Sequence, residues 1–315
     1  MLLKSYSIAS NTFKEALREP IFFILLSAAI ALIGLFPSLA LFVFKEQTKF
    51  IIDSSMATTL SFGLAVAVLC ASSTISREIR NGTVLLMMSK PVSRLTFILS
   101  KAMGIFAALT VFVFICTLAS ILSVQVAGDQ FNFDFFTLYL YYGIIAIASA
   151  IGTFRNFYAK KSFSESSVYA ISILLPVFII ALQIFPFSKK LLPFPYELLP
   201  ALTLLFFAVW TMGAISVMLS TKLDVVANLA VSSFIFSLGL ISDYLFTSGV
   251  SSTLLKNIAY TVVPNWQFFW LADAIANKTP ISWTYVIWCG LYSILYFIFC
   301  SVIAITLFTN REVAA

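Results

Sequence analysis

The sequence predicts an all-α protein, a polytopic membrane helical bundle of about eight transmembrane helices that follows an N-terminal interfacial amphipathic helix. Of the 315 residues, 61% are hydrophobic and only 10% are charged, whereas a soluble domain carries about 25% charged residues. Apolar runs of about 20 residues, the length that crosses a bilayer as a helix, recur along the chain. Alternating segments of strand length are too few for a barrel, so the spans are predicted to be helical.

Residues 1–19 form the first predicted unit, a helix that lies in the membrane interface. Apolar residues recur there at steps of three and four, and polar residues occupy the other faces of the helical wheel. The apolar set is Leu2, Tyr6, Ala9, Phe13 and Leu17, and the polar set is Lys4, Asn11, Lys14 and Arg18. The alternative is an ordinary soluble N-terminal tail.

Residues 20–315 form the predicted transmembrane domain. Its eight spans are Ile21–Phe44, Met56–Ile75, Phe97–Val126, Phe135–Phe154, Ser167–Phe187, Leu199–Leu219, Val225–Phe246 and Ile281–Phe308. A charged loop, Lys45–Asp53, is expected before the second span, a tight turn at Ser220–Asp224 and a polar segment at Thr247–Pro280. The fourth and fifth spans are either two full crossings or bent, re-entrant segments.

The basic residues predict the orientation. With a cytoplasmic N-terminus, thirteen of the 19 Lys and Arg residues fall in cytoplasmic segments and six fall outside. Cytoplasmic loops carry the excess of positive charge. We therefore expect an integral, multi-pass protein with an even number of spans and both termini in the cytoplasm. The expected membrane is a bacterial cytoplasmic (inner) membrane.

The sequence excludes the common enzyme classes. It has no histidine, and its four cysteines, Cys70, Cys116, Cys289 and Cys300, lie in apolar segments without paired spacing. No phosphate loop, H-E-x-x-H, G-x-S-x-G or C-x-x-C motif occurs. We predict no catalytic residue, no metal site and no cofactor held by this chain. The basic residues form no patch with stacking aromatics, so no nucleic-acid partner is expected.

The stretch between the second and third spans, residues 76–94, is the most informative. Arg77, Glu78 and Arg80 are charged, and Leu86, Met87 and Met88 are apolar. Asn81-Gly82 permits a sharp bend, Pro91 ends the element, and Ser93 can cap the following helix. Apolar side chains presented in water need lipid or a groove on a partner protein. The alternative is a solvated loop that only obeys the positive-inside rule.

This stretch resembles the permease family of ABC exporters that includes the copper-processing and multidrug permeases. The matching residues are Glu78, Gly82, Thr83, Leu85, Leu86, Ser89, Lys90, Pro91, Val92, Ser93 and Arg94. Further similar stretches are Asn11–Arg18, Leu219–Thr221, Ser242–Leu245, Pro264-Asn265 and Asn310–Glu312.

The resemblance implies a chain that works with a cytoplasmic ABC ATPase subunit, which binds ATP and Mg²⁺, and with a second permease copy or a paralogue, a homodimer being expected. Residues 76–94 would be the coupling element that fits a groove on the ATPase, with Glu78, Gly82, Thr83, Leu85, Leu86, Ser89, Lys90, Pro91 and Arg94 as its coupling residues. The usual family member has six spans, so 135–199 would be an extra hairpin.

The outer segment carries a cluster of aromatic residues, Trp266, Phe268, Phe269 and Trp270. One interpretation is that they anchor a helix at headgroup depth, where Trp is enriched. The other, which the resemblance suggests, is an outer gate over an exit path formed by Asp243, Trp266 and Phe269. Asp243 serves equally well as a helix cap or a surface residue.

The predicted function is therefore the transmembrane permease subunit of an ABC exporter, surrounded by membrane lipid. Two alternatives remain, a non-transporting membrane scaffold that recruits a soluble partner and a secondary transporter. The acidic residues nearest the membrane interior, Glu78, Asp224 and Asp243, lie near predicted helix ends, which disfavours a proton-coupled carrier. The substrate is not determined by these patterns.

Overall fold

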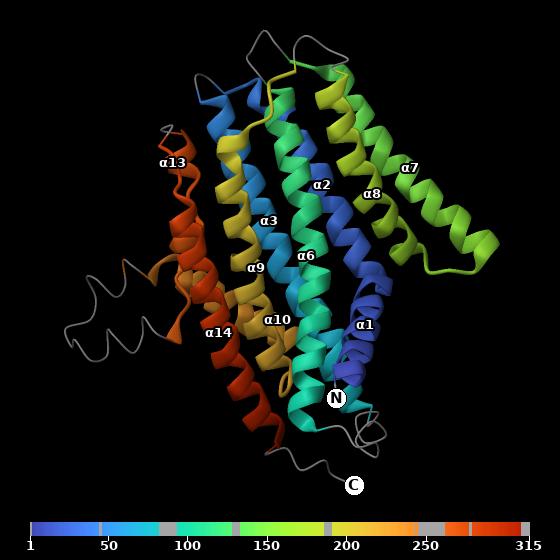
Figure 1. Ribbon diagram of the computed structural model, residues 1–315, viewed down its shortest axis with the longest axis vertical. Coiled ribbons are helices and arrows are strands. Elements are labelled where there is room, and N and C mark those ends of the chain that lie inside the picture. Colours follow the sequence, from blue (N-terminus) through green and yellow to red (C-terminus); the bar gives the residue numbers. More distant parts are fainter. Residues whose placement is uncertain are drawn as a thin grey trace.

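The computed structural model describes residues 2–43, 46–81, 93–127, 133–185, 191–242, 244, 262–276 and 279–309. This part of the chain is an all-α bundle (Figure 1). Its long helices are α1 (Leu2–Arg18), α2 (Pro20–Ala40), α3 (Gln47–Ala71), α6 (Arg94–Val126), α7 (Phe135–Ala159), α8 (Phe163–Ile184), α9 (Leu199–Ser220), α10 (Val225–Leu240) and α14 (Trp283–Thr309). The short elements are the π-helix η1 (Ser72–Ser76), α4 (Arg77–Arg80), η2 (Tyr196–Leu198), η3 (Trp266–Phe269) and α13 (Ala272–Ala276).

Seven helical stretches are long and apolar enough to cross a membrane, which confirms the predicted polytopic bundle. They are α2, α3 with η1 and α4, α6, α7, α8, η2 with α9, and α14. The fourth and fifth predicted spans are α7 and α8, helices of 25 and 22 residues. Each is therefore long enough for a full crossing.

The second span is longer than predicted at both ends. Helix α3 begins at Gln47, so most of the loop predicted at Lys45–Asp53 is helical, and the helical path continues through η1 and α4 to Arg80. No proline or glycine interrupts Gln47–Asp53, and a helix can extend beyond the lipid when its polar side chains find partners. Lys49 pairs with Asp273 at 3.1 Å.

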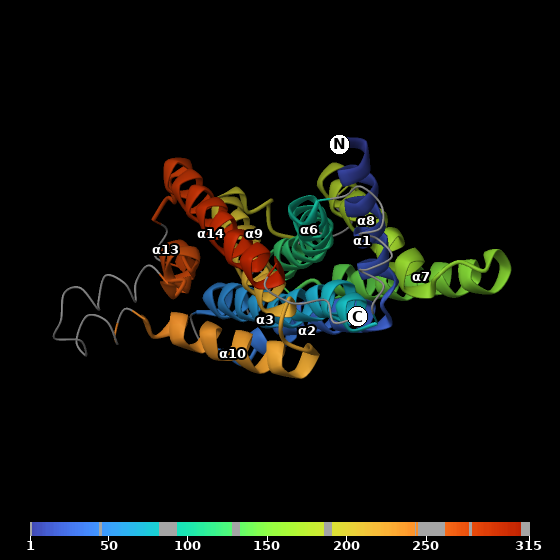
Figure 2. The same cartoon turned by 90° about the horizontal axis from the view of Figure 1, so that it is seen from below.

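Helix α6 lies at the centre of the bundle. Figure 2 shows it between α1, α8, α9 and α14, with α3 and α2 close by. Ser93 caps its first turn, as predicted, by accepting a hydrogen bond from the Thr96 N–H at 3.1 Å. Buried Phe112, Leu109 and Ala108 belong to the main hydrophobic core. Helices α7 and α8 form a hairpin that leans away from this core (Figure 1).

The seventh span is shorter than predicted. Helix α10 has 16 residues and ends at Leu240 rather than Phe246, a length of about 24 Å against the roughly 30 Å of a hydrocarbon core. A Cβ atom on Gly239 would collide with the Pro264 carbonyl oxygen and the Trp266 indole. Residues 262–276, the folded-back segment, therefore meet the end of this helix at Pro264 and Trp266, an arrangement that local hydrophobicity does not reveal.

The folded-back segment lies beside α14. Three tyrosines on one face of α14 bond its backbone: Tyr296 donates to the Val262 carbonyl at 2.7 Å, Tyr285 donates to the Phe268 carbonyl at 2.7 Å, and the Tyr292 hydroxyl accepts from the Asn265 N–H at 3.4 Å. Irregular backbone at membrane depth is tolerated only where protein or water satisfies it. Helix α10 and residues 262–276 together replace one continuous span.

The start of α1 and the last turn of α14 lie at the same end of the bundle (Figure 1). Phe97 in the first turn of α6 stacks on Phe308 near the end of α14, with ring centroids 6.0 Å apart. Helix α1 packs along the same end of α6. The start of α1 and the end of α14 therefore lie on the same side of the bundle, while the predicted cytoplasmic location of the termini stays a prediction.

Candidate functional site

Helix α1 is amphipathic and packs across the first half of α6. Thr12, Ala16 and Leu17 are buried, whereas Asn11 and Lys14 are exposed. The two helices approach closely at Gly104, where a Cβ atom would lie 2.7 Å from the Thr12 Cβ and would also clash with the Ala9 carbonyl oxygen. The contact holds the carboxylates of α1 beside the end of α3.

The end of α3 widens into the π-helix η1 before α4 begins. Such single-turn π segments are rare and occur often at functional sites. The Arg77 N–H reaches back to the Ser72 carbonyl, the i→i−5 bond of a π-helix. Buried Asn228 of α10 holds this turn by donating to the Ser72 hydroxyl at 3.1 Å, and Ser76 donates to the Leu223 carbonyl at 2.9 Å.

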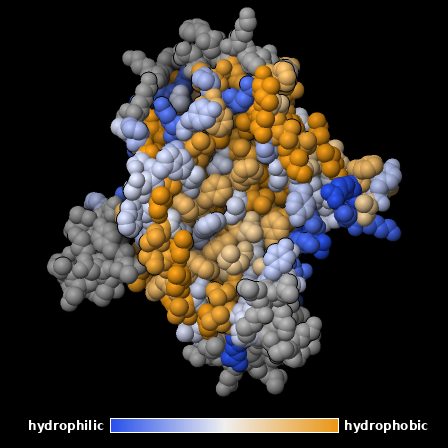
Figure 3. Space-filling view, in the orientation of Figure 1, coloured by the Kyte–Doolittle hydropathy of each residue, from blue (hydrophilic) through white to orange (hydrophobic). Residues whose placement is uncertain are grey.

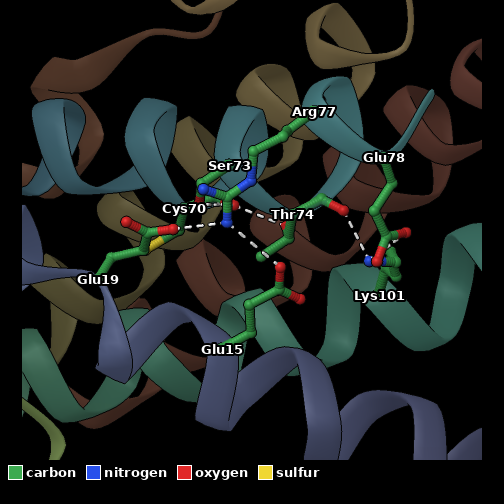
Figure 4. A network of polar contacts seen from close by, with 8 residues as sticks. All are labelled: Glu15, Glu19, Cys70, Ser73, Thr74, Arg77, Glu78 and Lys101. Carbon is green, nitrogen blue, oxygen red and sulfur yellow. Dashed lines mark hydrogen bonds and ion pairs between the residues drawn. The ribbon is translucent and has the colours of Figure 1, made fainter. Parts of the chain in front are cut away.

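Arg77 joins α4 to the α1–α2 junction, because it pairs with Glu15 in the last turn of α1 and with Glu19 just before α2. Its Nη2 atom lies 2.6 Å from a Glu19 carboxylate oxygen and 3.5 Å from one of Glu15. Guanidinium pairs of this kind are charge-assisted and fix orientation. Figure 4 shows the three side chains converging from α4 and from the α1–α2 junction.

Lys101 of α6 is the buried centre of the network, with only 2% of its side chain exposed. Its ammonium group lies 2.7 Å from the Glu78 carboxylate, donates to the Thr74 carbonyl of η1 at 2.6 Å, and sits 5.5 Å from the Phe97 ring centroid. A buried ammonium is tolerable only when it is paired and hydrogen-bonded in this way. Figure 4 shows Glu78 and Thr74 reaching Lys101 from one helical segment.

The charge network is therefore Glu15, Glu19, Arg77, Glu78 and Lys101, three carboxylates and two cations. Burial raises the pKa of the Glu15 carboxyl above its ordinary value, and Glu78 adds to this increase, while Lys101 and Arg77 oppose it. The pKa of Glu15 therefore depends on the position of α1. A shift of α1 would change the pairing of Arg77 and the burial of Glu15 together.

Of the predicted coupling residues, the structure describes only Glu78 and Arg94. Glu78 belongs to the charge network, and Arg94 is the exposed first residue of α6. Gly82, Thr83, Leu85, Leu86, Ser89, Lys90 and Pro91 lie outside the described residues, as do Val92 and Asp243. Residue 81 follows α4 and residue 93 precedes α6, so both flanks of this stretch lie at the end of the bundle that holds the charge network.

Sequence reasoning missed Glu15, Glu19, Arg77 and Lys101 as network members. Lys101 carried a signal, since a lysine inside a predicted apolar span is expensive unless it is paired. The sequence-based interpretation used it only as a cation that sets topology. Glu15 and Glu19 carried none, because their pairing with Arg77 spans 62 and 58 residues of chain.

Trp266 and Phe269 are packed inside the protein, 2% and 0% exposed. Trp266 lies against Phe236 of α10, with centroids 5.6 Å apart, and Phe269 lies 6.0 Å from the ring of Tyr292 on α14. The interpretation of these two side chains as headgroup anchors is therefore wrong. Phe268 is 43% exposed.

A cavity of about 790 Å³ opens at the opposite end of the bundle from the charge network. Its lining includes Glu46, Lys49 and Ile52 at the start of α3, and Tyr196 and Glu197 before α9. The Leu192 N–H donates to the Gln125 carbonyl at the end of α6 at 3.0 Å, which closes one side.

The four cysteines are buried free thiols, as predicted. Over the ranges that the structure describes, no three His, Cys, Asp or Glu side chains come together in a way that could hold a metal ion.

The sequence matches the model of a family described as ABC-2 family transporter protein over residues 6–197, which is more than half of the 315 residues. The match includes α1, the end of α3 with η1 and α4, and α6, the elements that supply the charge network. A search of curated proteins found no match.

Proposed function

The chain belongs to the ABC-2 family of transporter proteins, and from that premise we propose that this integral membrane permease is the translocating subunit of an exporter driven by ATP hydrolysis on a separate ATPase. The ATPase would bind ATP and Mg²⁺, because the chain contains no phosphate loop. Residues 76–94 would dock into a groove of the ATPase in the cytoplasm.

The charge network carries the proposal. The undescribed stretch 82–92 is bounded by α4 and α6, and the Glu78–Lys101 pair bridges these two elements at 2.7 Å. Arg77, one residue before Glu78, is bound to α1 and α2. A force applied to 82–92 would thus act on α6 through the pair made by buried Lys101 and on α1 and α2 through the partly exposed contacts of Arg77.

A nucleotide state can drive this change only by binding one arrangement better than another. Buried ion pairs provide distinct arrangements, since an unpaired buried charge is strongly unfavourable. We propose that closure of the ATPase repositions α4 relative to α6 and α1, and that α3 carries this movement across the membrane.

The remainder of the assembly is proposed from the same family membership. A second copy of the chain would complete the translocation path as a homodimer in a bacterial cytoplasmic membrane, with lipid around it and both termini in the cytoplasm. Trp266 and Phe269, with Asp243, would form the outer gate. The position of Trp266 and Phe269 between α10 and α14 supports this, because a broken span can change its packing more easily than a continuous one.

The proposal is tested with Glu78→Lys and Leu86→Asp, each in the chain reconstituted with its ATPase in proteoliposomes. Both variants should reach the membrane in normal amounts and lose transport-linked stimulation of ATP hydrolysis, because one breaks the charge network and the other places a charge in the apolar docking surface. Lys14→Glu, an exposed charge reversal outside both the charge network and the cavity, is the control and should keep its stimulation. Normal ATP-driven transport in both variants would dispose of the coupling role.

Purification from native membranes separates the exporter from the two alternatives. An ATPase that comes with the chain supports the exporter. Another soluble protein in its place supports the scaffold, and transport by the chain alone supports a secondary transporter. The last is disfavoured because the acidic residues in the described spanning stretches lie near their ends: Asp53, Glu78, Glu165 and Glu197.

A further inference from the structure

A basic pocket lies where the α7–α8 hairpin meets the α1–α2 junction. The cavity measures about 540 Å³, and its lining includes Arg18, Arg155, Lys160, Lys161 and Glu165. Glu165 pairs with Arg18 at 2.8 Å. None of the ion pairs among the described residues includes Arg155, Lys160 or Lys161. Three positive charges therefore remain unbalanced beside one cavity.

The turn that carries these cations is built by its own hydrogen bonds. The N–H groups of Lys160 and Lys161 both donate to the Arg155 carbonyl, and the Asn156 side chain donates to the Lys161 carbonyl at 2.8 Å. Lys160 adopts a left-handed conformation, with φ 50°, at the end of α7, where glycine or asparagine is the usual residue. The sequence has a lysine at this unfavourable position, which keeps a cation at the pocket.

The start of α8 adds to the positive potential. A helix N-terminus carries partial positive charge and backbone N–H groups that lack intrahelical partners. Ser162 makes no side-chain cap at this end. The hairpin is also anchored, because the Ser164 hydroxyl donates to the Leu17 carbonyl at 2.7 Å and contacts the Glu19 carbonyl at 3.1 Å.

Apolar surface continues from the pocket toward the middle of the membrane. On α7, Phe154, Phe157 and Tyr158 are 61%, 78% and 70% exposed, and tyrosine is enriched at headgroup depth. Exposed aliphatic side chains follow along α8: Ile173, Val177, Ile180 and Ile184. Figure 3 shows hydrophilic atoms at the end of the hairpin beside hydrophobic surface on its length.

We propose that this pocket binds the phosphate headgroup of an anionic phospholipid, whose acyl chains lie along the exposed aliphatic side chains of α8. A basic site between membrane helices provides the charge that such a headgroup needs. A free phosphate would use the cations but not the adjoining apolar surface, so the geometry favours the lipid. Arg18 of α1 lines the pocket, and Ser164 of the hairpin bonds to Leu17 of α1. The bound lipid would therefore lie at the contact between the hairpin and α1.

The test measures lipid binding to the delipidated full chain by native mass spectrometry, with phosphatidylglycerol and phosphatidylcholine as the probes. The variant is Lys160→Asn with Lys161→Gln, because asparagine tolerates the left-handed turn and both changes remove charge without removing a backbone N–H. Wild type should prefer phosphatidylglycerol. The variant should bind it at least tenfold more weakly, at about fivefold for each cation removed, with phosphatidylcholine binding unchanged.

The matched control is Lys14→Gln with Lys222→Gln, two exposed cations at the same end of the bundle but outside the pocket. It should retain wild-type preference, and an equal loss would overturn the site in favour of diffuse charge attraction. Competition by inorganic phosphate at lipid concentrations would reassign the pocket to a free anion. If the double variant unfolds at a lower temperature than wild type, Lys161→Gln alone decides, and unchanged phosphatidylglycerol binding in it overturns the proposal.

Discussion

Lys101 is the residue on which the charge network depends most. Its ammonium group has lost almost all contact with water, and Glu78 and the Thr74 carbonyl replace that hydration. Removing one partner of a buried pair leaves an uncompensated charge, which is far less favourable than removing both. The pair therefore favours one register of α6 against α3.

We expect Lys101→Met to destabilise the protein by about 3 kcal/mol, because it leaves the Glu78 carboxylate and a backbone carbonyl without their buried donor. The double variant Glu78→Gln with Lys101→Met should recover part of this loss. The measurement is the unfolding midpoint in detergent, with Lys14→Met as an exposed control. Equal midpoints for Lys101→Met and wild type would show that the pair contributes nothing to stability.

Only one member of the charge network, Glu78, was identified from the sequence. The resemblance identified Glu78, because the motif that contains it is local. The partners of Glu78 and Arg77 lie on α6 and on the α1–α2 junction, and helical register between separate elements decides which charges meet. That register is set by contacts such as Gly104 against Thr12, which no local pattern encodes.

At the scale of elements, the packing of α1 on α6 positions Glu15 and Glu19. The closest point is Gly104, where an added methyl group would meet backbone atoms of α1. A backbone obstruction cannot rotate away as a flexible side chain can. The residue is therefore a glycine because of the space between two helices.

We expect Gly104→Ala to destabilise the α1–α6 contact by about 1–3 kcal/mol, the range for overpacking a tight interface. Gly143→Ala is its control in α7, since no atom lies within 4 Å of the added Cβ. That change should stabilise by about 0.5–1 kcal/mol, as alanine favours a helix interior over glycine. Thermal unfolding of both variants tests the pair, and a stabilising Gly104→Ala would contradict the tight approach.

The predicted elements show which features of a membrane protein are local. Apolar runs placed α2, α6, α7, α8, α9 and α14 correctly, because the hydrophobic thickness of a bilayer sets span length directly. The end of α10 was wrong, since the apolar residues Ile241, Leu245 and Phe246 follow Leu240 in the sequence. Beside the last residue of α10, Gly239 leaves room for residues 264 and 266, which lie more than 20 residues later in the chain.

At the scale of the whole molecule, the broken span preserves the parity of the crossings. The start of α6 and the end of α14 meet at Phe97 and Phe308. Asp273, near the end of the folded-back segment, pairs with Lys49 at the other end of the bundle. Residues 160–161 and 221–224 share one end with the charge network, whereas Glu197 lies at the other.

Cysteine labelling in intact cells tests this arrangement. The native thiols are buried, so a membrane-impermeant maleimide should report only introduced sites. We expect Glu197→Cys to be labelled from outside, and Lys161→Cys and Lys222→Cys only after the membrane is opened, in keeping with the positive-inside rule. Labelling of Lys161→Cys in intact cells would place the charge network outside the cell and end the docking proposal.

The uninterrupted helical path from Gln47 to Arg80 has a thermodynamic consequence. Its 34 residues make a rod of about 50 Å, which has Arg77 and Glu78 at one end and Lys49 beside the 790 Å³ cavity at the other. A molecule that binds in the cavity and favours one position of this helical rod would also favour one arrangement of the ionic contacts at the rod's other end. Linkage makes that effect reciprocal, so cargo and nucleotide would each sense the other, with η1 as the one compliant turn between them.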